Sequence, residues 1–490
     1  PISLLVAANC DSGGNGACSE GTYIASGAQA EAAGDLQVSY HAGLVSAREE
    51  KALGVNVNFD PCVDILYNWR NTIVNTRAYG TDAETVIKYT NAYLDGLTAE
   101  NGENMEDGVI QCIKHFPGDG TEERDQHLVL GVNELSPEEW RASFGKVYQN
   151  HIDRGVEMIM AGHIAVPALQ KELNPALEDK DIMPATLAEE LIQDELKTEL
   201  GFNGLVITDA THMLGMTSAM RREDYVPKSI AAGCDMFLFF NNIAEDFGFM
   251  LKGYQNGVIT EERLTDALRR ILGLKAKLHL PEKQANGTLL RTREDLNVIG
   301  CEEHLQWRAE AADKGISLIK DTQNNLPINP VDHKRIRLYM LEGEKGGITD
   351  NGSKAQQLFV DELTKRGYEV TVNERGSRVK GATLKYRDEV DFALEVADIA
   401  GYGAQNNYRI QWSTAMANEV PWFVWEVPHA FVSLNFTTHL HDATMVKTFV
   451  NAYHNNEETI KQVIDKLEGK SEFKGGHNDL VWTDKWQAKL

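Results

Sequence analysis

The chain has 490 residues, more than one hydrophobic core usually encloses, so we expect two domains. Its 42% hydrophobic and 25% charged residues are ordinary for a globular protein, and no apolar run approaches the roughly 18–20 residues that cross a bilayer. A formal net charge of −25 argues against nucleic acid and anionic membranes as partners, because both require clustered Lys and Arg.

The six cysteines are spread thinly and form no CxxC pair, which indicates free thiols and favours a reducing, cytoplasmic location. No HExxH or paired Cys/His spacing suggests a metal, so none is expected. Gly13-Gly14-Asn15-Gly16 is not a dinucleotide fingerprint, and we expect no cofactor. The chain opens at Pro1 without an initiator Met, so we expect a preceding segment and leave secretion open.

The first 280 residues alternate short apolar strands with longer amphipathic helices. The expected strands are Ser3–Ala8, Val55–Phe59, Val109–Lys114, Met158–Ala161, Leu205–Thr208 and Met236–Phe239. The expected helices are Gln37–Leu53, Ala83–Ala99, Pro137–Arg154 and Thr186–Leu200. Nearly continuous apolar strands in this order predict a parallel sheet buried on both faces. The spacing favours a (β/α)8 TIM-like barrel over residues 1–280 whose opening strands precede Pro1, with a doubly wound open sheet as the alternative.

Residues 281–302 are polar, carry Pro and Gly, and break this pattern, which predicts a linker between domains. A smaller α/β sandwich domain is expected over residues 303–490. Its expected elements are a helix at Glu303–Lys314, strands near Ile316–Ile319, Arg335–Leu341, Glu369–Val372 and Phe431–Asn435, and a closing helix at Glu458–Leu467.

Most expected strands of the first domain end at or near ionisable residues, namely Asp64, Lys114 with His115, His163 and Asp209. In a barrel, catalytic groups come from the carboxyl ends of the strands. A single Asp at such a position could simply cap a helix. Four polar strand ends in succession favour a shared pocket.

The segment from Lys114 to His127 combines a strand end, a tight Pro-Gly loop and an Asp-x-His sequence. Asp125 can accept a hydrogen bond from one imidazole nitrogen of His127 and leave the other to transfer a proton. The segment resembles the signature KH-F/I-PG-H/N-G-x4-D-S/T-H of the β-N-acetylglucosaminidases of glycoside hydrolase family 3. Asp119 stands where that family usually has His or Asn, and Gln126 where it has Ser or Thr.

Further segments are similar to the same family. Residues 201–210 resemble its nucleophile segment, which implies that Asp209 attacks the anomeric carbon. Residues 59–65 and 75–82 resemble the family's FAPVxDV…xRSFGxD. By this resemblance, the residues that hold sugar hydroxyls or support the site are Arg77, Lys114, His115 and Asp64.

The match at the N-terminus stays open. The family has DQEGGR after its strand, with the Asp gripping the sugar, whereas this chain reads Asn9-Cys10-Asp11. Either Asn9 replaces that Asp, or Asp11 takes over in a shifted register. His163 either reaches the pocket or packs behind it. A catalytically weak sugar-binding or sensor protein is a further alternative.

The resemblance covers almost the whole chain and implies a retaining, exo-acting β-N-acetylglucosaminidase. Asp209 would form a covalent glycosyl-enzyme, and His127, oriented by Asp125, would act as acid and base. Because a histidine tolerates an anionic acceptor better than a carboxylate does, a phosphorylase is an alternative. Another is a family 3 β-glucosidase whose acid/base lies in the second domain, for example Glu426 or Glu342. Muropeptides from peptidoglycan, chitobiose and host glycans all present the implied terminal sugar, so the natural substrate stays open.

Overall fold

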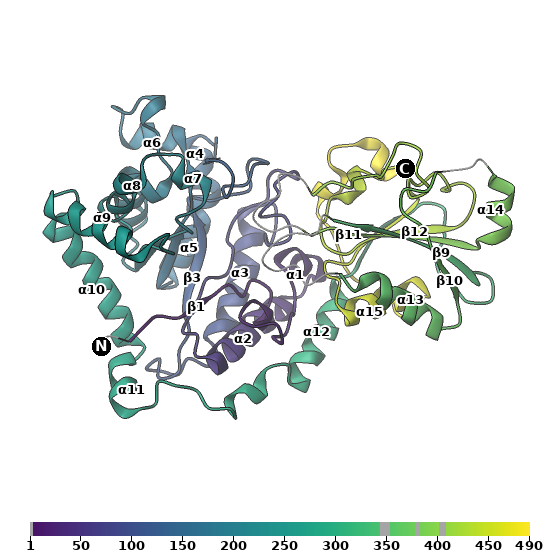
Figure 1. The fold of residues 1–490 in the computed structure, drawn as a ribbon, viewed down its shortest axis with the longest axis horizontal. Coiled ribbons are helices and arrows are strands. Elements are labelled where there is room, and N and C mark those ends of the chain that lie inside the picture. The colour runs from purple at the N-terminus through teal and green to yellow at the C-terminus, as the bar shows by residue number, and fades with distance from the viewer. Residues whose placement is uncertain (1–2, 344–352, 379–381, 401–407) are drawn as a thin grey trace. The chain divides into compact units, whose positions relative to one another are not determined.

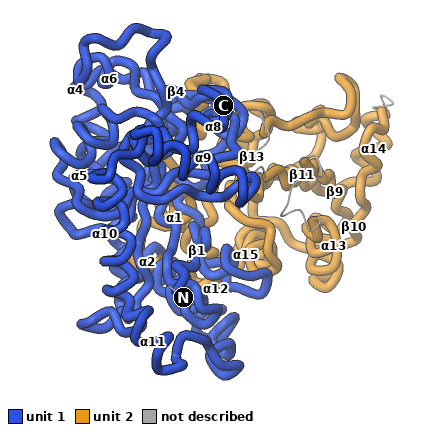
Figure 2. The backbone as a smooth tube through the Cα atoms, turned by 60° about the vertical axis from the view of Figure 1, so that its left-hand side comes forward, with its two compact units in different colours: residues 1–27, 39–305 blue, residues 28–38, 306–490 orange. Residues whose placement is uncertain are grey.

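The computed structural model describes residues 3–343, 353–378, 382–400 and 408–490 (Figure 1). The chain divides into two compact units, one of residues 1–27 and 39–305 and the other of residues 28–38 and 306–490 (Figure 2). Over the described residues, no helix combines the length and the apolar character that a bilayer crossing requires.

A parallel β-sheet forms the centre of unit 1. Its strand order is β1-β2-β3-β5-β7, and every neighbouring pair is parallel. The strands are β1 Ala7–Ala8, β2 Val57–Asn58, β3 Ile110–Phe116, β5 Met158–Ala161 and β7 Leu205–Thr208. The short strands β4 Gly131–Val132 and β6 Ile164–Ala165 form a separate pair. The predicted parallel α/β architecture is confirmed, and β5 and β7 have the predicted bounds.

Three expected strands of unit 1 are reduced in the structure, and one of them, Val55–Phe59, shortens to β2. Ser3–Ala8 reduces to β1, and the segment after Met236, which bridges to Ile207, forms no strand. The pairing ends at Met236: the Leu238 N–H donates to the Thr208 hydroxyl and not to a strand carbonyl, and Phe239 has a backbone φ of 63°, outside the extended region. The described residues of unit 1 thus form a five-stranded parallel sheet and not a closed ring of eight strands.

Helices connect the strands of unit 1. They are α2 Leu36–Leu53, α3 Ala83–Thr98, α4 Pro137–Trp140, α5 Lys146–Asp153, α6 Pro167–Leu173, α7 Leu214–Thr217, α8 Arg222–Ala231, α9 Ile243–Gln255, α10 Glu261–Lys277 and α11 Leu280–Asn286. Asp82 caps α3, because its Oδ1 accepts a hydrogen bond from the Thr85 N–H at 2.9 Å. The expected helix at Pro137–Arg154 is interrupted by a π-helical turn, and most of the one expected at Thr186–Leu200 is a π-helix, Glu190–Glu199.

The strands of unit 1 direct alternate side chains into one hydrophobic core. Its buried members are Val57, Phe59, Ile110, Cys112, Met158, Met160, Leu205, Ile207, Leu274, Leu278 and Leu280. Because these side chains hold the strands in register, the carboxyl ends of β3, β5 and β7 meet at one edge of the sheet.

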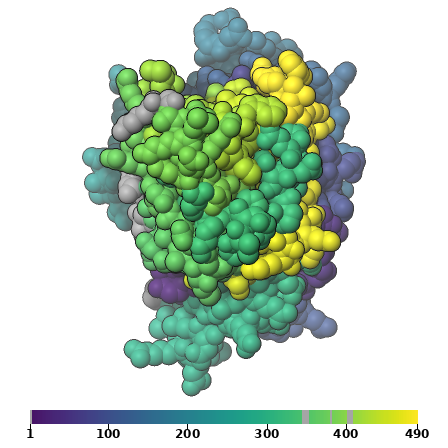
Figure 3. Space-filling model, turned by 90° about the vertical axis from the view of Figure 1, so that its right-hand side faces the viewer, coloured from purple at the N-terminus to yellow at the C-terminus, as the bar shows by residue number. Residues whose placement is uncertain are grey.

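Unit 2 contains a six-stranded sheet in the order β10-β9-β11-β12-β13-β8, and β8 is antiparallel to β13. The strands are β8 Ser317–Asp321, β9 Arg335–Glu342, β10 Glu369–Val372, β11 Phe392–Asp398, β12 His429–Ser433 and β13 Thr448–Asn451. Helices α13 Ala355–Lys365 and α15 Glu457–Leu467 pack on one face, and α14 is Thr383–Glu389. Figure 3 shows a face on which segments of this unit gather, coloured green to yellow.

The segments that connect the two units contain helices of their own. Helices α1 Gly27–Ala33 and α12 Glu302–Gly315 each cross from one unit to the other. The predicted linker, residues 281–302, belongs to unit 1 and is largely exposed. It includes most of α11 and a 3-10 turn at Asp295–Val298.

Candidate active site

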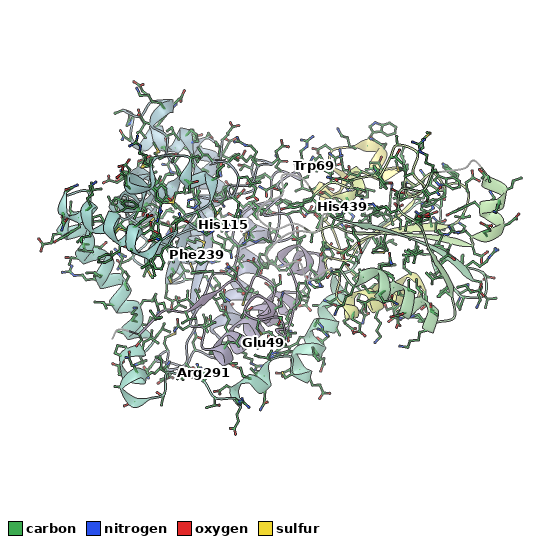
Figure 4. The ribbon with its side chains drawn as sticks, viewed as in Figure 1. Glu49, Trp69, His115, Phe239, Arg291 and His439 are labelled. Atoms are coloured by element: carbon green, nitrogen blue, oxygen red, sulfur yellow. The ribbon has the colours of Figure 1, made fainter. Side chains whose placement is uncertain are left out.

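The polar residues that follow the strands of unit 1 lie at one edge of the sheet. Phe116 of β3 pairs with Ala161 of β5, and Ala161 pairs with Thr208 of β7. His115 and Asp209 are each one residue from this row, so the register brings them to the same edge. Figure 4 labels His115. The sequence predicted that the polar strand ends share a pocket, and the register brings two of these residues, His115 and Asp209, to one edge.

Asp209 is held by the backbone at the end of β7. Its N–H donates to the Ala161 carbonyl at 2.8 Å, and its Oδ1 accepts from the Ala210 N–H at 2.7 Å. Burial alone would raise the pKa of Asp209, but the charges of His115, His163 and His127 and the Ala210 hydrogen bond outweigh it. The pKa therefore lies below its ordinary value, and Asp209 is an ionised carboxylate at neutral pH.

His127 and Asp125 form a closely hydrogen-bonded pair. His127 Nδ1 lies 2.6 Å from Asp125 Oδ1, and the same oxygen accepts the His127 backbone N–H at 2.8 Å. Asp125 is fully buried, whereas the His127 side chain is 26% exposed. Because the carboxylate takes Nδ1, the imidazole is oriented so that proton exchange with a substrate would use Nε2.

Backbone hydrogen bonds join the loop of this pair to the segment after Asp209. The Leu214 N–H donates to the His127 carbonyl at 2.9 Å, and the Gly215 N–H donates to the Gln126 carbonyl at 3.1 Å. The structure thus brings together a carboxylate from the end of β7 and a carboxylate-oriented histidine from the loop after β3, a set of groups able to serve as nucleophile and acid/base.

His115, at this edge, pairs with Asp64. Its Nδ1 lies 2.7 Å from Asp64 Oδ2, and Asp64 Oδ1 accepts the Asp119 N–H at 2.8 Å. Burial would raise the pKa of Asp64, but the charge of His115 and these hydrogen bonds lower it overall. Cys62 Sγ lies 3.1 Å from Asp64 Oδ2, and Cys62, Asp64 and His115 are the group of described residues whose ligand atoms could hold a metal ion.

A buried network of charges surrounds Lys114. Its Nζ lies 2.7 Å from Asp60 Oδ1 and 3.4 Å from Asp11 Oδ1, and it donates to Asn9 Oδ1 at 3.0 Å. Arg77 Nε lies 3.0 Å from Asp11 Oδ2. Burial would raise the pKa of Asp11, but Arg77 and Lys114 hold it well below its ordinary value. Both N-terminal candidates, Asn9 and Asp11, therefore contact Lys114.

His163 is fully buried and contacts the residue that follows Asp209. Its Nδ1 lies 3.0 Å from Thr186 Oγ1 and its Nε2 lies 2.9 Å from the Ala210 carbonyl, so both ring nitrogens contact protein groups. Burial lowers the pKa of His163. These contacts support the segment that carries Asp209.

Three residues contact the candidate site residues although the sequence did not propose them as part of the site. Asp60 pairs with Lys114. It directly follows the expected strand Val55–Phe59, whose residues are uncharged and do not indicate an ion pair. Asn71 donates to Asp119 Oδ1 at 2.9 Å. Gln126 Oε1 accepts the His163 N–H at 2.8 Å, a contact over 37 residues that spacing does not reveal.

The carboxylates considered for a second-domain acid/base both belong to unit 2. Glu426 forms an ion pair with Arg387, whose Nε lies 2.8 Å from Glu426 Oε2. Glu342 ends β9. The Asp125–His127 pair, in contrast, lies in the same unit as Asp209.

Comparison with known proteins identifies the class. The Glycosyl hydrolase family 3 N terminal domain matches residues 1–274. A protein of Cellulomonas fimi named Beta-N-acetylglucosaminidase/beta-glucosidase is 39% identical over 494 residues, which cover 100% of this chain and 86% of that protein. The chain belongs to glycosyl hydrolase family 3 and is a glycoside hydrolase.

Solved structures show the same fold. The structure named Beta-glucoside phosphorylase BglX is 38% identical, covers 100% of this chain and 86% of that chain, and has a TM-score of 0.93. A glycoside hydrolase family 3 beta-N-acetylglucosaminidase from Paenibacillus sp. str. FPU-7 shares the fold with a TM-score of 0.78 at 22% identity, over 97% of this chain and 86% of that one.

Proposed function

We propose that this enzyme removes terminal β-linked N-acetylglucosamine from the non-reducing end of its substrate with retention of configuration. Asp209 attacks the anomeric carbon while His127 protonates the leaving oxygen, which gives a covalent glycosyl-enzyme. His127, now neutral, deprotonates a water molecule that attacks the same carbon and releases the sugar and Asp209. Asp125 keeps the imidazole in the orientation that both steps need.

The observation that carries this proposal is the 2.6 Å contact between His127 Nδ1 and Asp125 Oδ1, in a loop whose backbone pairs with the segment after Asp209. The lowered pKa of Asp209 supports its role as an ionised nucleophile. In the proposed complex, Arg77, Lys114 and His115 donate to sugar hydroxyls, and Asp11 or Asn9 accepts from them, with Asp64 and His163 as supports.

We also propose that the sheet of unit 1 is part of a (β/α)8 barrel and that residues 303–490 form a second domain. The location of the polar residues at the carboxyl edge of a parallel sheet supports the first statement. The separate six-stranded sheet of unit 2 supports the second.

Phosphate is a second candidate acceptor. A histidine acid/base is neutral after it has protonated the leaving group, so it does not repel an approaching phosphate as a carboxylate would. The relative named Beta-glucoside phosphorylase favours the same possibility. Phosphate attack on the glycosyl-enzyme would return the carboxylate of Asp209 and give the sugar 1-phosphate.

The test measures release of p-nitrophenol from the β-N-acetylglucosaminide and the β-glucoside, each with and without phosphate. The enzymes are wild type, Asp209→Ala, His127→Ala, and the exposed His477→Ala as control. We expect faster cleavage of the N-acetyl substrate, no turnover by Asp209→Ala, and unchanged rates for the control. Loss of the general acid should lower the rate of His127→Ala by about 10²–10⁴-fold.

Three results would redirect the proposal. Sugar 1-phosphate as the main product identifies phosphorolysis. Faster cleavage of the β-glucoside than of the β-N-acetylglucosaminide would mean that the enzyme is specific for glucose. An active His127→Ala variant would mean that His127 is not the acid/base. The acid/base would then be sought in unit 2, by replacing Glu426 and Glu342.

A further inference from the structure

Three side chains that can bind a metal ion converge on one buried carboxylate oxygen. Cys62 Sγ lies 3.1 Å from Asp64 Oδ2, and His115 Nδ1 lies 2.7 Å from the same oxygen. The three ligand atoms all lie within 4.8 Å of one another, and none of the three residues is more than 6% exposed. A thiol, a carboxylate and an imidazole therefore face one another at a single point inside unit 1.

Backbone contacts hold this group together. Cys62 forms a parallel bridge with Lys114, which places the segment that carries Cys62 and Asp64 beside the end of β3. Asp64 Oδ1 accepts the Asp119 N–H at 2.8 Å and the His115 N–H at 3.3 Å. These two bonds leave Oδ2 directed at Cys62 and His115, so the fold itself positions the three ligand atoms.

The set of ligand atoms fits Zn²⁺. Thiolate sulfur, imidazole nitrogen and carboxylate oxygen are the atoms that bind zinc in proteins, and a site with three protein ligands leaves a fourth position open. Tetrahedral coordination at ordinary zinc bond lengths sets the ligand atoms about 3.4–3.6 Å apart, so the two short contacts have to lengthen by about 0.5–0.7 Å. The hard cations Mg²⁺ and Ca²⁺ prefer oxygen ligands, and a thiol disfavours them. The sequence gave no indication of this site, because Asp64 and His115 are 51 residues apart.

Two hydrogen bonds occupy the place that the ion would take. Asp64 Oδ2 accepts the Cys62 thiol proton, and a carboxylate 2.7 Å from Nδ1 keeps the proton of the neutral imidazole on that nitrogen. When Zn²⁺ binds, the thiol proton is released to water and the Nδ1 proton moves to Nε2. The thiolate and the carboxylate then balance the two positive charges of the ion, so the buried site carries no net charge.

We propose that Cys62, Asp64 and His115 bind Zn²⁺ and that the bound ion inhibits the enzyme. Binding separates His115 from its hydrogen bond with Asp64 and fixes the ring on the ion. Because His115 lies at the same strand edge as Asp209, this shift changes the site next to the proposed nucleophile. The inhibition rests on the proposed function, in which His115 donates to a sugar hydroxyl, whereas the binding of the ion does not.

Binding is measured first, because it requires no substrate. After treatment with a chelator, the enzyme is titrated with Zn²⁺ in competition with a chromogenic chelator, and with Cd²⁺, whose bond to a thiolate absorbs in the ultraviolet. We expect wild type to bind one ion per chain and Mg²⁺ not to compete. In Cys62→Ser and Cys62→Val, the Cd²⁺–thiolate absorption should disappear. The Zn²⁺ affinity should fall at least about tenfold, since even groups outside the ligand shell contribute this much.

Inhibition is measured on p-nitrophenyl β-N-acetylglucosaminide and on the β-glucoside, with whichever acceptor, water or phosphate, gives the faster turnover. Each variant is compared with its own rate without metal. We expect saturating Zn²⁺ to lower the wild-type rate at least about tenfold, as the loss of a hydrogen bond to the sugar would, and the chelator to restore it. The Zn²⁺ concentration for half-maximal inhibition should rise at least about tenfold in both Cys62 variants.

Cys301→Ser, which removes a partly exposed thiol outside this group, provides the matched control and should respond as wild type does. A wild-type enzyme that binds no Zn²⁺, or equal binding after replacement of Cys62, would overturn the proposed site. Binding that leaves the rate of an active enzyme unchanged would overturn the inhibition. If wild type turns over neither glycoside, the proposed function fails, while the Cd²⁺ absorption still decides whether Cys62 binds the ion. If Cys62→Val does not fold, Cys62→Ser, which retains a hydrogen-bond donor to Asp64, decides the matter.

Discussion

Asp119 is a buried carboxyl group that keeps its proton at neutral pH. Burial and the negative charge of Asp64 raise the pKa of Asp119 to about 8. Its Oδ1 accepts hydrogen bonds from Asn71 Nδ2 at 2.9 Å and from the Gly120 N–H at 2.6 Å. The β-N-acetylglucosaminidase signature that this segment resembles usually has His or Asn at this position. The carboxyl group of Asp119 therefore adds a titration that an Asn amide would not have.

The sign of this titration gives a prediction for stability. Because the folded-state pKa of about 8 exceeds the ordinary value of 3.8, the folded protein retains a proton that the unfolded chain loses between about pH 4 and 8. The contribution of Asp119 to the free energy of unfolding therefore falls as pH rises through this window. In Asp119→Asn, we expect a smaller loss of stability between pH 5 and pH 8 than in wild type, as urea unfolding will measure.

Glu50, whose pKa burial also raises to about 8, titrates over the same range in both proteins, so only the difference between them reports on Asp119. The exposed Asp153→Asn should reproduce the wild-type curve. Parallel pH curves for wild type and Asp119→Asn would mean that Asp119 is already ionised in the folded protein.

At the scale of elements, apolar patterns predicted strands well where the backbone stays extended. Strands β5 and β7 have uninterrupted apolar sequences and match their predicted bounds. The expected strand to Phe239 did not form, because the Leu238 N–H bonds to the Thr208 side chain and Phe239 has a positive φ, neither of which an apolar pattern reveals. Strand β11 was missed because Glu395, a fully buried carboxyl group, interrupts its apolar sequence.

The same limit applies to the elements of the site. The spacing of Asp125 and His127 within one loop predicted a contact that the structure places at 2.6 Å. Gln126 was seen only as a departure from the family pattern, because its side chain contacts a distant strand end. Long-range contacts of this kind depend on how β3 and β5 pair, which local sequence does not specify.

Gln126 connects three elements, and its removal should destabilise the fold. Its Oε1 accepts the buried His163 N–H after β5, and its carbonyl accepts the Gly215 N–H of α7. In Gln126→Ala, the His163 N–H loses its acceptor inside the protein, which should cost about 1–3 kcal/mol of unfolding free energy. Urea denaturation at pH 7 measures this loss.

The exposed Gln306→Ala, whose side chain bonds only to Glu310 among the described contacts, should change stability by less than about 0.5 kcal/mol. A comparably small effect for Gln126→Ala would show that water accepts the His163 hydrogen bond in place of the Gln126 side chain, without loss of stability.

At the scale of the whole molecule, unit 2 is assembled from two separate stretches of chain. Ala28 and Ala32 pack against Tyr453, and the Gly476 N–H donates to the Ala32 carbonyl at 2.7 Å. Lys314 Nζ lies 2.8 Å from Asp35 Oδ2. Residues 28–38 therefore belong to the packing of unit 2 although residues 39–305, which follow them, return to unit 1.

This topology predicts that one cut in unit 1, ahead of residues 306–490, does not release that stretch of unit 2. The segment around Arg293 is exposed, so a specific protease site inserted there can be cleaved in the folded protein. We expect both fragments to co-elute in size-exclusion chromatography under native conditions and to separate in urea, because residues 28–38 stay packed in unit 2. Ala32→Asp places a charge against Tyr453 and should weaken this association. Elution of the C-terminal fragment alone, without that substitution, would mean that residues 306–490 fold and dissociate independently of residues 28–38.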